Sequence, residues 1–372
     1  VGGRMQGNLA MSPSGKNLSA RGHLQQLRLM TPRRGMTLSD VDFDLRSTPD
    51  TTAAKIDAGD LHLQLAAAGN LQSISRQAQR IAQLAERQIA ARTIDQEALR
   101  RALPTLQFHL EAGSDNPLAS IARHYSYEFS SVSLHLTCDA QHGLNGHTAV
   151  GKLGVGKLLI DTIHGQLQHD STGINLALNV HNNKRTNPNP FSARLKSYLY
   201  DHGLGAELVF ADSKGDVGLQ LGSRVELAEG GYRVRLYPDE PIVAYRRFKI
   251  NEDNFIFLGQ DRRIQADVRL LADDGTGLMV RSADESTAKN DLSVNIKDLN
   301  LGELANVLPY LPKLQGHLNG DFHLVDDGQT LSAMGSLEAK DFAYEQAALG
   351  TLGAEIAYLP KSQGEHHVDA FV

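Results

Sequence analysis

The chain has 372 residues, 37 Lys and Arg against 43 Asp and Glu, and a formal net charge of −6. This mild negative charge excludes a broad nucleic-acid-binding surface, so no nucleic acid is expected as a partner. Tryptophan is absent, aromatic residues make up 6%, and 34 residues are glycine, which favours a thin sheet with many turns over several thick cores. The single cysteine, Cys138, excludes an internal disulfide.

The first element that the sequence predicts is a β-hairpin over Gly3–Leu24, and the same pattern recurs over Gly316–Leu337. The two segments align without a gap, and the glycines at positions 3, 7, 15 and 22 match glycines in the second copy. In both copies apolar residues alternate with polar ones, as on a strand with one buried face. A repeated hairpin is therefore predicted as the building unit.

The alternation continues through Leu38–Leu45 and Leu61–Leu65, which predicts further strands. The period then changes. Over Leu71–Ala91 apolar side chains recur at helical spacing in a run rich in Ala, Gln and Arg, which predicts an amphipathic helix. Asp95–Ala102 predicts a second, shorter helix.

The polar side of the first predicted helix is basic and carries Arg76, Arg80, Arg87 and Arg92. One interpretation is a helix at a membrane surface or among lipid headgroups. The other is a helix that lies on the sheet, with Ile74, Ile81 and Leu84 turned inward and the arginines in water. The alanine-rich apolar stripe buries little area, which favours the second interpretation.

From Leu106 onward the alternation resumes and predicts a series of strands as far as Ile296. Glycine pairs and Asp-Gly pairs between them predict hairpin turns. One segment in this series, Phe191–Tyr200, is interpreted as a short helix. The connections are too short for crossover helices, so neighbouring strands are predicted to be antiparallel and the sheet to be a meander.

The predicted elements divide the chain into four segments. Residues 1–69 form strands of the repeat, and 70–103 form an amphipathic helical insertion. Residues 104–297 form further strands, with a loop or short helix near 185–203, and 298–372 form a short helix followed by the second hairpin repeat. Asn300 and Glu303 have the spacing of a capping box at the start of that helix. Since Val1 and Val372 both sit in strand-like sequence, the chain is expected to be an internal piece of a longer protein.

The run Asn300–Leu324, NLGELANVLPYLPKLQGHLNGDFHL, resembles the repeat of the TamB and AsmA-like proteins of diderm bacteria, in which the spacing L..L..LP.L.G.L.G...L recurs. The resemblance covers most of the chain and is most specific from Tyr198 onward. It implies a repeating β-groove that carries phospholipid acyl chains through the periplasm, between the inner and outer membranes, and supports outer-membrane biogenesis. It also implies an inner-membrane anchor outside this segment, and an outer-membrane assembly protein of the Omp85/TamA type as partner at the C-terminal end.

The predicted fold is therefore mainly β: a long antiparallel meander curled into an open, twisted β-groove with an apolar interior and a few short helices. The residues predicted to line the groove share the apolar phase of their strands. They are Leu61, Leu63, Leu65, Val132, Leu134, Leu136, Ile174, Leu176, Leu178, Val217, Leu219, Leu221, Val234, Leu236, Val268, Leu270, Leu292, Val294, Ile296, Leu318, Phe322 and Leu324.

Motifs that would indicate an enzyme are weak. Gly151–Lys157 matches the core of a phosphate-binding loop, but Leu158 stands where Ser or Thr would hold magnesium, and the following residues predict a strand instead of a helix. Four side chains able to bind zinc lie near one another in the sequence: His135, Cys138, His142 and His147. Their positions on a strand and in a turn favour a structural reading. We therefore expect no catalytic residue, metal or cofactor.

Two other architectures share this alternation. A transmembrane β-barrel carries its apolar side outward, but the chain lacks the aromatic girdles of such barrels, and the helices after Leu71 would interrupt one. A structural or adhesive β-repeat with a closed, packed core is the other, and periodicity alone does not separate it from a lipid-binding groove.

Overall fold

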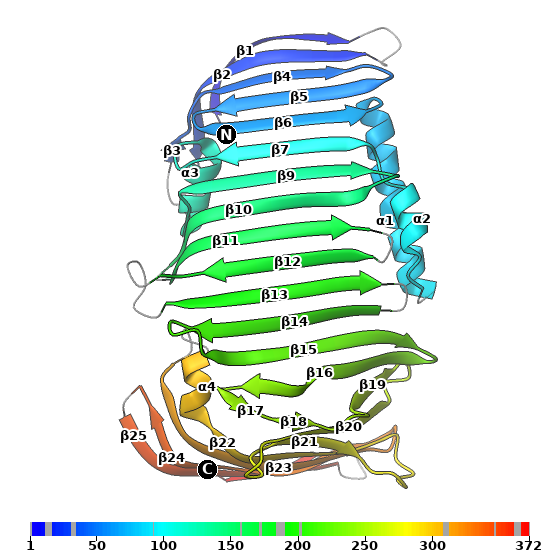
Figure 1. The fold of residues 1–372 in the computed structure, drawn as a ribbon, viewed down its shortest axis with the longest axis vertical. Helices are drawn as coiled ribbons and strands as arrows, with labels where there is room; N and C mark the ends of the chain where they lie inside the picture. The colour runs from blue at the N-terminus through cyan, green and yellow to red at the C-terminus, as the bar shows by residue number, and fades with distance from the viewer. Residues whose placement is uncertain are drawn as a thin grey trace. The chain divides into compact units, whose positions relative to one another are not determined.

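The computed structural model describes residues 2–11, 17–30, 35–91, 93–156, 158–170, 173–183, 190–200, 203–307, 312–345, 347–360 and 366–371. The chain is mainly β, as predicted, with antiparallel strands in a meander and four helices among the described residues (Figure 1). Its contacts divide it into two compact units, Val1–His202 and Gly203–Val372. Val1, Val372, Arg92 and Lys157 lie outside the described residues, as do parts of the segment 185–203.

In the first unit each long strand pairs antiparallel with the next. The strands in sheet order are β1 (Gly2–Met11), β2 (Leu18–Met30), β4 (Val41–Ser47), β5 (Thr51–Ala58), β6 (Leu61–Ala68), β7 (Leu106–Ala112), β9 (Ser131–Asp139), β10 (Gly143–Val155), β11 (Leu158–His169), β12 (Ile174–His181) and β13 (Phe191–Tyr200). The short strands β3 (Gly35–Thr37) and β8 (Tyr127–Glu128) extend the pairing of β2 and β10. Among the described residues β1 and β13 do not pair with each other, so this sheet is open.

Three helices belong to the first unit. They are α1 (Leu71–Ala91) and α2 (Gln96–Arg101), which connect β6 to β7, and α3 (Pro117–His124), which follows β7. Asp95 caps α2 by accepting the amide of Ala98 at 2.8 Å. The first two helices confirm the prediction, whereas α3 has no counterpart in it. Within the described part of the chain, no helix has the length and apolar character that spanning a membrane requires.

The predicted short helix at Phe191–Tyr200 is wrong, because this segment is strand β13, paired with β12 along its length. The reason is visible in its alternation. Phe191, Ala193 and Leu195 are turned inward, while Ser192 and Arg194 are exposed, which is period two and leaves no apolar stripe at helical spacing.

The second unit repeats the meander. Its strands in sheet order are β14 (Gly203–Asp212), β15 (Val217–Ala228), β16 (Gly231–Val243), β19 (Phe255–Gly259), β20 (Ile264–Leu271), β21 (Gly277–Ser282), β22 (Asn290–Asn300), β23 (Leu314–Asp326), β24 (Leu331–Tyr344), β25 (Ala347–Pro360) and β26 (His366–Phe371). The short strands β17 (Arg246–Arg247) and β18 (Lys249–Ile250) pair with β16 and β20. Helix α4 (Leu301–Val307) connects β22 to β23.

Both copies of the predicted repeat fold as hairpins, β1–β2 and β23–β24. Their registers differ, because Met11 pairs with Leu18, whereas Leu324 at the corresponding position pairs with Ala333, two residues past the equivalent partner. Asp327 stabilises the second turn by accepting the Thr330 amide at 2.7 Å. A shift of two residues keeps each side chain on its own face, so both hairpins keep the same apolar side despite the difference in register.

Candidate functional site

The register of the first unit aligns apolar side chains from strand to strand. One row consists of Leu45, Ala54, Leu65, Phe108, Leu136, Gly146, Leu167 and Leu176. The neighbouring row consists of Phe43, Ile56, Leu63, Leu110, Leu134, Thr148, Gly165, Leu178 and Leu195. We call these two rows the apolar face. The two rows run together over eight strands, from β4 to β12, and at about 4.8 Å per strand spacing this stretch is roughly 34 Å long. The second row continues onto a ninth strand, β13, at Leu195.

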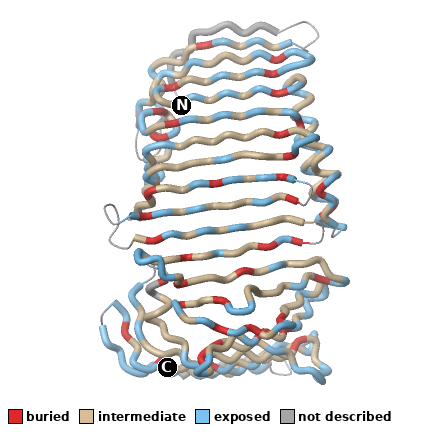
Figure 2. The backbone as a smooth tube through the Cα atoms, in the orientation of Figure 1, coloured by how far each residue is buried: buried red, intermediate tan, exposed pale blue. Residues whose placement is uncertain are grey.

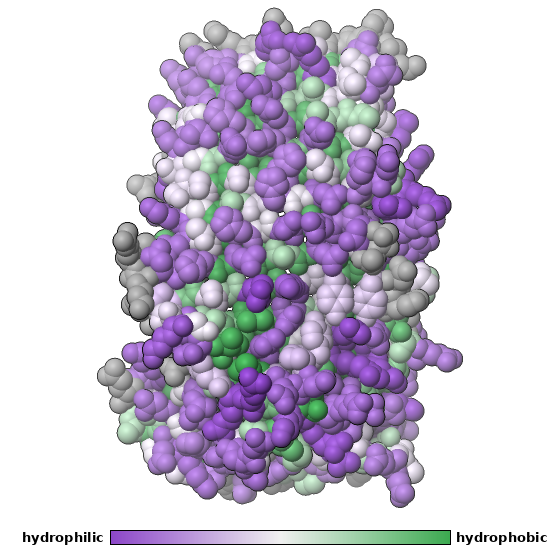
Figure 3. All heavy atoms as spheres, in the orientation of Figure 1, coloured by the Kyte–Doolittle hydropathy of each residue, from purple (hydrophilic) through white to green (hydrophobic). Residues whose placement is uncertain are grey.

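No second sheet covers the apolar face within the described residues. Every Leu, Ile and Phe side chain of the two rows is only half-buried, whereas comparable side chains in a packed core are almost fully enclosed. The side of the molecule drawn in Figure 3 is mostly hydrophilic, with small groups of apolar residues between the hydrophilic ones. A contiguous exposed apolar surface of this kind marks a binding site for an apolar ligand, a membrane or another protein.

Along one margin the strand ends are covered by α1 and α2 (Figure 1). Several buried residues lie at this margin (Figure 2). The buried residues near the two helices or the segments next to them are Ser47, Thr52, Ala67, Cys138 and His169. The Leu71 amide donates to Ser47 Oγ at 3.0 Å, which joins the start of α1 to β4. At the other end Gln96 Nε2 donates to the Leu199 carbonyl of β13 at 2.8 Å. The two helices therefore form a rim that is attached at both ends and leaves the central rows open.

The orientation of α1 agrees with the second interpretation of its sequence. Ile74, Ile81 and Leu84 are half-buried, and the described arginines of its basic side are exposed: Arg76, Arg80 and Arg87. Burial lowers the pKa of His169 at this margin, with a further contribution from the positive charge of Arg100. Burial also raises the pKa of the Cys138 thiol, so both groups are neutral parts of the packing.

Helix α3 lies at the opposite margin, beside the ends of a few strands (Figure 1). Ala58 and Ala112, at the ends of β5 and β7, are buried, and so is Ala119 of the helix. Asn116 is fully enclosed, accepts the Ala119 amide at 2.8 Å and donates to Asp60 Oδ1 at 2.6 Å. Burial alone would raise the pKa of Asp60, but hydrogen bonds from Asn116 and from the amides of Asp115 and Gly113 outweigh it and lower the pKa.

The strand registers show where the predicted lining residues lie. In the first unit Leu63, Leu65, Leu134, Leu136, Leu176 and Leu178 belong to the apolar face, Leu61 and Val132 lie toward α3, and Ile174 pairs with Leu199 beside α2. In the second unit Val268 pairs with Val280, Val280 with Val294, and Val294 with Phe322. In the neighbouring rows Leu270 pairs with Leu278, Leu278 pairs with Ile296, and Leu292 pairs with Leu324. Leu219 and Leu221 lie on the side of β15 that carries Ser223 and Val225, whose partners on β16 are Leu236 and Val234. Leu318 lies on the side of β23 that carries Phe322. A register shift between β14 and β15 separates Val217 from Leu219.

Val268 differs from all the other predicted lining residues because it is buried, with 2% of its surface exposed. The second unit also buries four other bulky apolar side chains: Phe210, Phe248, Ile250 and Val307. Phe248 and Ile250 come from the excursion of the chain between β16 and β19, where the Phe248 amide donates to the Pro241 carbonyl at 2.9 Å. Part of this unit's apolar side is thus covered by its own chain.

Sequence reasoning missed β5 (Thr51–Ala58), which contributes Ala54 and Ile56 to the apolar face. Alanine and threonine give this strand a weak apolar signal. The signal that could have found it is the alternation itself, in which Thr52, Ala54 and Ile56 are more buried than Thr51, Ala53 and Lys55.

The zinc-binding side chains noted in the sequence do not converge. His135 stacks on His147 with ring centroids 5.1 Å apart and meets His109 edge-on at 5.9 Å, which makes a histidine row across β7, β9 and β10. Cys138 lies three residues along β9 from His135 and so belongs to the other face. Among the described residues no group of three His, Cys, Asp or Glu side chains is placed to hold a metal ion.

No protein-family model, curated protein or solved structure matches this chain.

Proposed function

We propose that the apolar face of the first unit binds the acyl chains of phospholipids, as part of a conduit that moves phospholipids through the periplasm between the inner and outer membranes. The observation that carries this proposal is the two-row apolar face, which runs in register over eight strands and has only half-buried side chains. Such a face requires a cover that is not protein from the same unit.

The energetics favour acyl chains as that cover. Each methylene group moved out of water onto an apolar surface contributes about 0.8 kcal/mol, so a chain with many methylenes binds without any specific polar contact. A row of half-exposed leucines with glycines at Gly146 and Gly165 offers a smooth surface along which such a chain can shift.

The cellular setting comes from the resemblance of Asn300–Leu324 to the TamB and AsmA-like repeat. On that basis the proposal includes a periplasmic location, an inner-membrane anchor in the parent protein, and an outer-membrane assembly protein of the Omp85/TamA type as partner. The role is transport, not catalysis.

The test introduces a charge into the apolar face and compares it with the same charge on the opposite face. Leu176→Asp places a carboxylate among the acyl chains, which costs about 2.5–3.5 kcal/mol on membrane-insertion scales and lowers local lipid occupancy by about two orders of magnitude. Ala177→Asp, one residue along β12, is the matched control because its side chain lies on the polar face, opposite Gln166 and Lys196.

Native mass spectrometry of detergent-free protein measures the result. We expect bound phospholipid in the wild type and in Ala177→Asp, and loss of it in Leu176→Asp. Absence of phospholipid from the wild type, or equal lipid content in the two variants, would contradict the proposal.

A further inference from the structure

At both margins of the first unit the buried strand residues lie on the apolar side of the sheet. Those near α1 and α2 share the phase of the apolar face: Ser47, Thr52, Ala67, Cys138 and His169. Ala58 and Ala112, at the α3 margin, have the same phase. Neighbours of the polar phase, such as Arg46, Ala66 and Glu111, are exposed. The helices therefore lie over the apolar side of the strand ends.

Helix α1 repeats one triplet three times: an exposed arginine, a packed residue and an exposed apolar residue. The triplets are Arg76-Gln77-Ala78, Arg80-Ile81-Ala82 and Arg87-Gln88-Ile89. Successive residues of an α-helix turn by about 100°, so the arginines form one flank and the apolar residues form the other, with the packed side between them. Leu71, seven residues before Ala78, lies on the apolar flank as well. Leu71 is 37% exposed and Ile89 is 71% exposed.

The strands determine which side of the sheet is apolar in the view of Figure 1. The chain of α1 and α2 runs along the margin in the order of the strands, from β4 to β13, where Gln96 contacts Leu199. The amide of Ala68, a polar-phase residue at the end of β6, donates toward β7, to the Thr105 carbonyl. For an L-residue in a strand that runs toward this margin, that geometry turns the polar face toward the viewer, in agreement with the mostly hydrophilic side drawn in Figure 3. The apolar face therefore lies on the far side of this view.

The handedness of α1 then decides which flank is turned to the apolar face. In a right-handed helix that runs down this margin with its packed side toward the strands, the residue after each packed residue turns away from the viewer. In α1 these residues are Ala78, Ala82 and Ile89. The apolar flank is therefore turned to the apolar face, and the arginine flank is turned to the other side and to water.

Helix α3 reaches the same result from the opposite margin. Asn116 at its start donates to Asp60 in the turn after β5, and the helix leads to β8, which pairs with β10, so α3 runs in the same direction as α1. Because its packed side faces the strands from the other margin, the residue before the packed one is turned to the apolar face. Leu118 directly precedes the buried Ala119 and is exposed, and Tyr125, two turns later, continues this exposed flank.

We infer that α1 and α3 are the side walls of the acyl-chain site, and that their apolar flanks contact the acyl chains bound on the two rows. This inference rests on the proposed function, because it concerns the same ligand and the same face. An exposed apolar flank is unfavourable in water, and its direction toward one face from both margins favours a shared apolar ligand. Between the walls the floor extends over six residue steps of β6, from Leu61 to Ala67, which is roughly 20 Å.

A charge on the apolar flank of α1 tests the wall. Ile89→Asp places a carboxylate against the acyl chains, whereas Gln83→Asp places the same charge beside the arginines, seven residues after Arg76. Both positions are exposed, so we expect equal melting temperatures for the two variants. The full chain is incubated with phosphatidylethanolamine vesicles in which one acyl chain carries a photoreactive diazirine, and labelled peptides are located by mass spectrometry.

We expect label on the strands of the apolar face and on α1 in the wild type and in Gln83→Asp, and about tenfold less label on α1 in Ile89→Asp. Label on the strands without label on α1 and α3, or equal label on α1 in the two variants, would overturn the inference and leave the proposed function intact. Label on α1 without label on the strands would indicate contact with the vesicle surface and would also overturn it. Absence of label from strands and helices alike would contradict the proposed function itself.

Cysteine variants provide a measurement that adds no charge. Ile89→Cys, Leu118→Cys and Gln83→Cys each accept an environment-sensitive fluorophore, and the native Cys138 does not compete because it is buried and burial raises its pKa. When unlabelled phosphatidylethanolamine vesicles are added, emission from positions 89 and 118 should shift to the blue, and emission from position 83 should not change. Equal shifts at all three positions, or no shift at 89 and 118 in protein whose strands take up the photoreactive lipid, would show that the helices are not walls of the site.

Discussion

The two units build their sheets from the same alternation but cover its apolar side differently. In the first unit the buried apolar residues are mostly small, such as Ala58, Ala67 and Ala112, and they lie at the strand ends. In the second unit Phe248 and Val268 are buried. Alternation thus produces an apolar face in both units, and the excursions of the chain decide whether protein covers it. The following predictions test that difference.

The largest loss of stability is expected from a charge placed in the part of the second unit's apolar side that its own chain covers. Val268→Asp buries an unpaired carboxylate and should destabilise the second unit by several kcal/mol. Leu176→Asp in the first unit should change the free energy of unfolding by less than about 1 kcal/mol, because that side chain retains contact with water. Thermal unfolding, with hydrogen exchange to identify the unit that opens, measures both. Equal losses of stability would remove the distinction between the units.

Truncation of a phenylalanine in each unit gives a second comparison. Phe248 is 4% exposed, so Phe248→Ala should leave a cavity and cost about 3–5 kcal/mol. Phe108 is half-buried on the apolar face, and Phe108→Ala should cost clearly less because solvent already reaches the site. Urea unfolding of the two variants checks the order. A larger loss for Phe108→Ala would mean that the apolar face is packed in solution.

The α3 margin of the first unit should behave as a closed site. Asn116→Ala removes the helix cap and the donor to Asp60, at an expected cost of about 1–3 kcal/mol. Because folding lowers the pKa of Asp60, the stabilisation from this carboxylate is present above its unfolded pKa of about 3.9 and is lost as pH falls.

The difference in unfolding free energy between the wild type and Asn116→Ala should therefore narrow below about pH 4. Asn175→Ala is the control, since Asn175 is exposed on β12. A difference in unfolding free energy that stays constant with pH would show that the hydrogen bond from Asn116 does not lower the pKa of Asp60.

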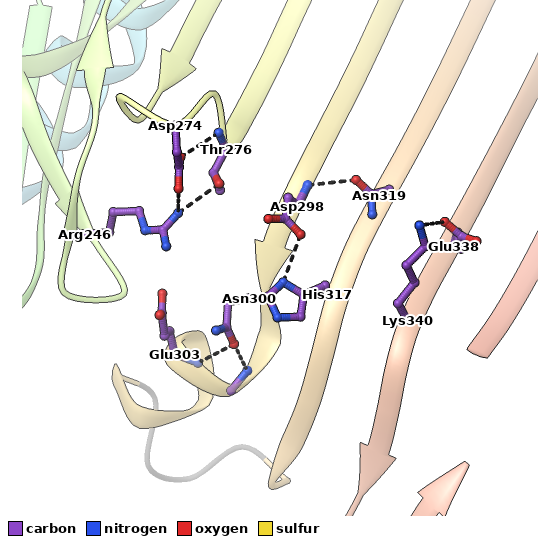
Figure 4. Close-up of polar contacts among 11 residues, drawn as sticks. Arg246, Asp274, Thr276, Asp298, Asn300, Glu303, His317, Asn319, Glu338 and Lys340 are labelled. Atoms are coloured by element: carbon purple, nitrogen blue, oxygen red, sulfur yellow. Dashed lines mark hydrogen bonds and ion pairs between the residues drawn. The ribbon is translucent and has the colours of Figure 1, made fainter. Parts of the chain in front are cut away.

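The smallest effect is expected at the start of α4. Asn300 Oδ1 accepts the amides of Gly302 at 3.0 Å and Glu303 at 3.2 Å (Figure 4). Asn300→Ala should cost about 1 kcal/mol and speed amide exchange in α4 without affecting β20. Asn300→Ser keeps an acceptor and should restore slow exchange. Faster exchange throughout the second unit would show that α4 is an integral part of its core.

Local sequence was sufficient for elements whose period is clear. Leu71–Ala91 is predicted with the bounds that the structure gives to α1, because helical spacing is sustained over many residues. Asn300 caps α4 as its spacing to Glu303 indicates. Phe191–Tyr200 was misassigned as a helix because a break precedes it and its alternation is short. Pro117–His124 was missed because eight residues carry little periodic signal.

The sequence by itself determined which side of each strand is apolar, because side chains alternate at a fixed period along an extended chain. It also determined that neighbouring strands are antiparallel, since short connections permit nothing else. Tertiary structure alone decided how that apolar side is covered. The rim formed by α1 and α2, the burial of Val268 and the contact of Val307 with Gly218 depend on how far the sheet curls and where distant segments meet. Neither the curl of the sheet nor the meeting of distant segments is encoded in the period of any single strand.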